Sequence, residues 1–121
     1  MGTWAAGNFA NDEALDYAHE LVDKMIRQVT KTIASKHGME PDEPDSARLM
    51  CNIDLIWLIG KHAGLSMPEA QTIQNWKTKY LAVWEKYIDG LDPKPGFKEE
   101  RRAVILKSFN RLIALCKNHE A

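Results

Sequence analysis

Four side chains near the start of the chain have the types and spacing to bind a divalent metal ion. They stand at i, i+3, i+4 and i+7, which share one helix face: Asp16, His19, Glu20 and Asp23. An acid followed three residues later by histidine is half of a ligand pattern found at two-metal sites in helical bundles. The second half is missing, because neither His62 nor His119 has an acid three residues before it. We therefore interpret the four as a solvated acidic face and predict no metal and no cofactor. A metal-dependent enzyme using Asp16, His19 and Asp23 is the alternative.

No other catalytic pattern stands out in the sequence. There is no Gly-x-Ser-x-Gly turn for a nucleophile and no glycine-rich loop of the kinds that hold phosphates. The two cysteines, Cys51 and Cys116, fall within apolar helical stretches, so we interpret both as small, unreactive core residues. The sequence therefore favours a protein that is not an enzyme.

The elements that must position these side chains are helices. Apolar residues recur at spacings of three and four along four segments, which proline and glycine separate. Asn11 is a good N-cap for the first segment, with Asp12 at its first helical position. Ser66-Met-Pro-Glu69 has the capping-box pattern that opens a helix. We predict helices at about 12–37, 46–63, 67–89 and 97–117.

Short breaks between long amphipathic helices are typical of antiparallel bundles. The predicted fold is all-α: one domain over residues 1–121, a compact four-helix antiparallel bundle-like arrangement with an ordered N-terminal hook at residues 1–11. The second helix is apolar on nearly every side around residues 53–59, which predicts the most buried helix. Asp54 within it is expected at the helix edge, near Lys61, with a buried and hydrogen-bonded carboxyl as the alternative.

The charges are unevenly distributed although the formal net charge is only −1. No Lys or Arg precedes Lys24, and a second group of acids lies in the proline-containing segment that follows the first helix. The sequence lacks the basic stripe of a nucleic-acid binder and any apolar run that could span a membrane. It also lacks the basic start of a secretory signal, so we expect a cytoplasmic protein. We predict a partner-binding surface formed by both acidic groups: Asp12, Asp16, Glu20, Asp23, Glu40, Asp42 and Glu43.

The N-terminal hook carries two aromatic residues, Trp4 and Phe9, on either side of Gly7. We interpret it as a lid on the bundle in which each aromatic side chain buries on the order of 150–250 Å². The alternative is that the hook and the acidic start of the first helix form a binding surface.

The same segment resembles the N-terminal signature G-T-W-G-x-G-x-F-x-N-D-x-A-x-D of a family of small bacterial proteins of unknown function. The matching residues are Gly2, Thr3, Trp4, Gly7, Phe9, Asn11, Asp12, Ala14 and Asp16. Ala5 departs from the signature, which has glycine there. The resemblance covers only about the first 16–25 residues and brings no catalytic residues. It implies a bacterial origin and a role as an immunity protein against a toxin.

These features favour a non-catalytic protein-binding module, most concretely an immunity protein that neutralises a cognate bacterial toxin through its acidic surface. A nuclease with a basic cleft is one such toxin. Trp76, Trp84 or Tyr87 could anchor the partner, although their helical spacing favours the core. The other alternative is a structural or regulatory module that forms a homodimer through the third and fourth helices. We expect neither direct nucleic-acid binding nor membrane binding.

Overall fold

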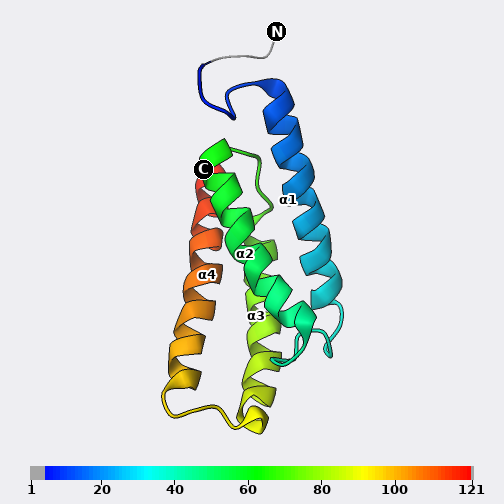
Figure 1. Ribbon diagram of the computed structural model, residues 1–121, viewed down its shortest axis with the longest axis vertical. Helices are drawn as coiled ribbons and strands as arrows, with labels where there is room; N and C mark the ends of the chain where they lie inside the picture. The colour runs from blue at the N-terminus through cyan, green and yellow to red at the C-terminus, as the bar shows by residue number, and fades with distance from the viewer. Residues whose placement is uncertain (1–4, 121) are drawn as a thin grey trace.

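The chain folds into four α-helices, and the computed structural model describes residues 5–120 (Figure 1). The elements are α1 (Asp12–Ile33), α2 (Pro44–Ala63), α3 (Ala70–Tyr87), the short 3-10 helix η1 (Ile88–Leu91) and α4 (Phe97–Glu120). Successive helices run antiparallel, and no strand occurs in the described part of the chain. The all-α prediction is confirmed. Within the same residues, no helix is both long and apolar enough to cross a membrane.

One apolar core lies between the helices and takes side chains from all four. Helix α2 packs against α1 on one side and α4 on the other, and α3 packs against α4. The fully buried side chains include Val22, Val29, Ile53, Ile56, Ile73, Trp84, Ile105 and Phe109. Burying one such side chain contributes about 1.5–3 kcal/mol, so this shared core determines how the helices sit together.

The first helix ends at Ile33 and not near residue 37 as expected. The Ser35 hydroxyl accepts a hydrogen bond from the Gly38 N–H at 3.1 Å, and residues 34–40 form turns. Serine side chains offer the backbone such an alternative to the helical ladder. Gly38 therefore lies within a turn and does not end the helix.

The predicted capping box at Ser66–Glu69 is wrong. Helix α3 begins only at Ala70, and its N-cap Glu69 makes no side-chain capping bond. A cap at Ser66 would require helical backbone at Met67, which the following Pro68 disfavours. The Ala70 N–H instead donates to Glu120 Oε1 at 2.8 Å, so the end of α4 caps the start of α3.

Helix α2 has the largest share of buried residues among the four helices, as predicted, but it is not buried on every side. Its inner face holds Ile53 and Ile56 in the core, but Leu55 and Leu58 are exposed on the outer face. Asp54 lies at the edge facing α4 and forms an ion pair with Arg111 at 3.0 Å. The expected neighbour Lys61 instead lies over the Trp57 ring, 4.7 Å from its centroid.

The two cysteines differ, contrary to the interpretation of both as core residues. Cys116 is buried, whereas Cys51 is exposed on the outer face of α2. Burial, with a smaller effect from the Glu120 charge, raises the pKa of the Cys116 thiol to about 11. The thiolate is the reactive form, so Cys116 is unreactive at neutral pH.

A thiol-specific disulfide reagent tests this difference. At about pH 8 we expect Cys51 of the folded chain to react quickly and Cys116 to react only after unfolding in urea, because its thiol is buried and protonated. The reaction is followed by absorbance, with Cys51→Ser as the control that removes the fast phase. Equal fast rates for both thiols in the folded chain would contradict the assignment.

Candidate partner-binding surface

Four carboxylates form a row along the outer face of α1. The helix begins where the sequence predicts, because the Asn11 side chain accepts from the Ala14 N–H at 2.8 Å. Its apolar stripe, which includes Ala18 and Val22, is buried in the core. With 3.6 residues per turn, the opposite face carries the exposed side chains of the α1 acidic row: Asp12, Asp16, Glu20 and Asp23.

The α1 acidic row has no ion-pair partner among residues 5–120. Its members repel one another, since Asp12, Asp16 and Glu20 are four residues apart, and each like-charged pair costs about 0.2–0.5 kcal/mol. The helix dipole favours acids only in the first turn, which contains Asp12 but not Asp16 or Glu20. No ion pair within the described residues offsets this repulsion.

The second acidic group, Glu40, Asp42 and Glu43, has a different environment. His37 Nδ1 lies 2.7 Å from Glu40 Oε2, and His37 Nε2 lies 3.1 Å from Glu43 Oε1. Both ring nitrogens can donate only when the imidazole is protonated. The hydrogen bond to Glu40 and the nearby charge of Glu43 accordingly raise the pKa of His37. Asp42 is exposed.

The structure does not bring the two acidic groups together. The α1 acidic row occupies the N-terminal half of α1, and the second group follows its C-terminal end (Figure 1). The helix rise places Asp16 about 25 Å from Ile33, where α1 ends. The expected single surface is thus divided: Glu40 and Glu43 of the second group are paired with His37, whereas no member of the α1 acidic row has an ion pair within the described residues.

Sequence reasoning missed an exposed aromatic residue beside the α1 acidic row. Tyr17 is 60% exposed, and helix geometry places it beside Glu13, four residues before it, and Glu20, three residues after it. The sequence could have predicted this exposure, because Tyr17 falls outside the apolar stripe that includes Ala18 and Val22. Exposed aromatic residues are common anchors at protein interfaces.

The predicted aromatic anchors lie elsewhere. Trp76 and Trp84 are buried in the core, as their spacing favours, and only Tyr87 is substantially exposed. In the N-terminal hook, Phe9 is 44% exposed, so the interpretation of this residue as a lid on the core is wrong. It borders a shallow hollow with His62. Three residues of the signature, Gly2, Thr3 and Trp4, lie outside the described residues.

The metal hypothesis receives no support from the geometry. Between residues 5 and 120, no group of three or more His, Cys, Asp or Glu side chains is arranged to hold a metal ion. Helix geometry explains this for His19, which is partly buried at one side of α1, whereas Asp16 and Asp23 point outward.

The family of the chain is known from its sequence. The model of a domain of unknown function (DUF4259) matches residues 2–115. The chain belongs to this family. The match covers α1, α2 and α3 of this DUF4259 protein and α4 as far as Leu115. No curated protein and no solved structure matches the chain.

Neutralising the centre of the α1 acidic row tests its lack of internal partners. In this DUF4259 protein we expect Asp16→Asn to raise the free energy of unfolding by about 0.5 kcal/mol at low salt, because it relieves two repulsive pairs. Asp54→Asn is the matched control and should lower it by up to about 1 kcal/mol, since Asp54 is paired with Arg111. Urea denaturation measures both. A loss of stability in Asp16→Asn would mean that Asp16 has a partner within the fold.

The His37 contacts predict a pH dependence. Because the pKa of folded His37 is raised above its ordinary value of 6.5, its contribution to stability is fully present below about pH 6.5. It is lost as the pH rises through the raised pKa. We expect the stability difference between the protein and His37→Gln to vanish at higher pH, and Glu40→Gln to return the ring titration seen by NMR toward 6.5. An unshifted titration of wild-type His37 would refute these contacts.

Proposed function

We propose that this DUF4259 chain is a non-catalytic protein-binding module that recognises a basic partner through α1. Its most concrete form is an immunity protein that occludes a cognate bacterial toxin, such as a nuclease with a basic substrate cleft. One observation carries the proposal: the α1 acidic row is exposed, lies beside the exposed Tyr17 and has no internal ion pair among the described residues.

Charge and aromatic area would have separate roles at this surface. Four carboxylates along one helix steer a basic partner toward α1, which raises the association rate and the selectivity for that partner. The Tyr17 ring supplies apolar contact area with a hydroxyl at its tip, which is typical of residues that dominate binding energy.

The rest of the fold supports this role by holding α1 rigid. Val22 and Val29 bury the inner face of α1 against the core, and the Asn11 cap orders its first turn. A surface that is already ordered loses little conformational entropy on binding.

Co-expression with the product of the neighbouring gene tests the proposal, because immunity proteins are usually encoded beside their toxins. We expect a complex on size exclusion and rescue of growth. Glu20→Lys should lower the association rate constant roughly tenfold at low salt, and Tyr17→Ala should weaken binding by about 30-fold.

Glu100→Lys is the matched control, because Glu100 is also an exposed glutamate without an ion pair in the described residues, but on α4. It changes the net charge equally and should leave binding unchanged. Absence of both a complex and growth rescue would refute the immunity proposal. Equal effects of Glu20→Lys and Glu100→Lys would refute the assignment of the surface to α1.

A further inference from the structure

A small cavity lies at the end of the bundle opposite the start of α1, where α2 begins and α3 passes through η1 toward α4 (Figure 1). Its volume is about 180 Å³. Its lining comes from three helices and η1 and includes Ser46, Tyr80, Trp84, Leu91, Phe97 and Arg101. This site is separate from the α1 acidic row and does not depend on the function proposed for it.

The cavity contains a buried pair of hydroxyl groups. Ser46 and Tyr80 are only 1% and 2% exposed, and their oxygens are 2.8 Å apart. One hydroxyl donates to the other, so the second hydrogen is left over, and no further acceptor for it occurs among the described residues. A buried donor without an acceptor is costly, which favours a ligand that accepts a hydrogen bond here.

The cavity also has a cation without an acidic partner. Arg101 is half-buried and forms no ion pair with residues 5–120. Arg101 lines the same cavity as Tyr80. Burial raises the pKa of Tyr80, and the Ser46 hydrogen bond and Arg101 oppose this rise. An anion beside Arg101 would gain charge-assisted hydrogen bonds.

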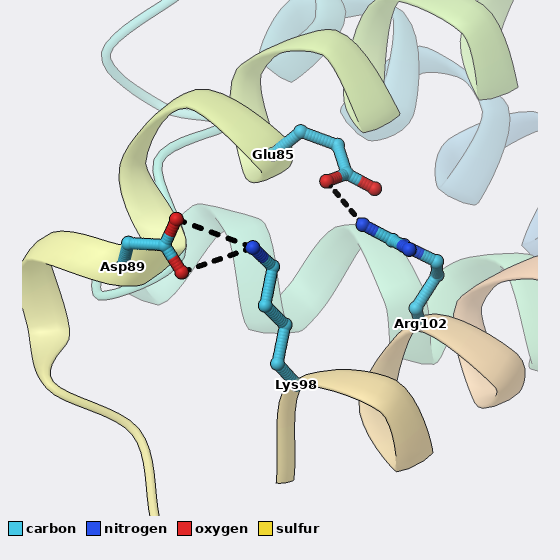
Figure 2. Close-up of polar contacts among 4 residues, drawn as sticks. All are labelled: Glu85, Asp89, Lys98 and Arg102. Atoms are coloured by element: carbon cyan, nitrogen blue, oxygen red, sulfur yellow. Dashed lines mark hydrogen bonds and ion pairs between the residues drawn. The ribbon is translucent and has the colours of Figure 1, made fainter. Parts of the chain in front are cut away.

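The neighbouring cations on α4 are neutralised within the fold, unlike Arg101. Figure 2 shows Lys98 and Arg102 directed toward acids of η1 and α3. Lys98 Nζ lies 3.0 and 3.2 Å from the two oxygens of Asp89, and Arg102 is paired with Glu85. These pairs hold the first turns of α4 in place, and with them Phe97 and Arg101.

The remaining lining is apolar and open at its rim. Trp84 is buried, whereas Leu91 and Phe97 are 47% and 46% exposed. An apolar cavity of about 150 Å³ is sufficient to bind benzene. The volume here, about 180 Å³, therefore suits a single ring together with a small substituent.

We propose that this cavity binds a group of about the size of benzene that carries one carboxylate. The carboxylate accepts hydrogen bonds from Arg101 and from the Ser46–Tyr80 pair, and the ring packs on Trp84, Leu91 and Phe97. A free aromatic acid and the carboxyl-terminal aromatic residue of a peptide share this chemistry.

Calorimetric titration of the full chain with phenylacetate and with its neutral analogue phenylacetamide tests the charge requirement. We expect phenylacetate to bind with a Kd on the order of 1 mM or tighter and phenylacetamide at least about tenfold more weakly. A second pair of titrations uses the peptide acetyl-Gly-Gly-Phe with a free or an amidated carboxyl terminus. Tighter binding of the free-terminus peptide than of phenylacetate identifies a peptide end as the source, and the reverse identifies a free acid.

Two variants test whether phenylacetate binds in this cavity. Arg101→Gln should weaken phenylacetate binding roughly tenfold, and Tyr80→Phe should weaken it while keeping the ring in the core. Arg27→Gln on α1 is the matched control, because Arg27 is exposed and does not line the cavity, and should have no effect. If circular dichroism shows that Arg101→Gln does not fold, the comparison of phenylacetate with phenylacetamide on the wild-type chain still tests the proposal. No binding of phenylacetate, or equal binding of acid and amide, would overturn the proposal.

Discussion

The packing of the apolar face of α1 against the core is the constraint on which the rest of the surface depends. Val22 and Val29 must leave water, and because a helix has only one face for this, the acids of the α1 acidic row are turned outward. The same fold neutralises charges elsewhere, as at Lys98 with Asp89 and at Asp54 with Arg111. The α1 acidic row differs from these pairs, because four neighbouring acids lie along one helix face and no ion pair within the described residues offsets their repulsion.

Periodicity was sufficient to predict the helices, because the apolar stripes and the Asn11 cap are local features. The helix ends were harder, because they depend on competing contacts. Ser35 stops α1 early through its hydrogen bond to the Gly38 N–H. The start of α3 is capped by Glu120, fifty residues away in the sequence, and no local pattern could predict that contact.

The candidate site was predictable only in part. The outward direction of Asp16 and Glu20 followed from helix geometry, but the separation of the second acidic group followed from the direction of α1 and the turns after it. His37, which lies 2.7 Å from Glu40, carried no signal in the sequence. Tyr17 could have been found as an aromatic residue outside the stripe. The cavity beside Arg101 depends on three helices meeting, and spacing along the chain cannot predict it.

Carbodiimide footprinting of carboxylates, read residue by residue by mass spectrometry, tests the central claim most directly. It compares the free chain with the chain bound to the product of its neighbouring gene. In the free chain Asp16, Glu20 and Asp23 should be modified faster than Glu85, which is paired with Arg102, and in the complex they should become protected. Protection of these three acids in the free chain, or their unchanged modification in the complex, would contradict the account.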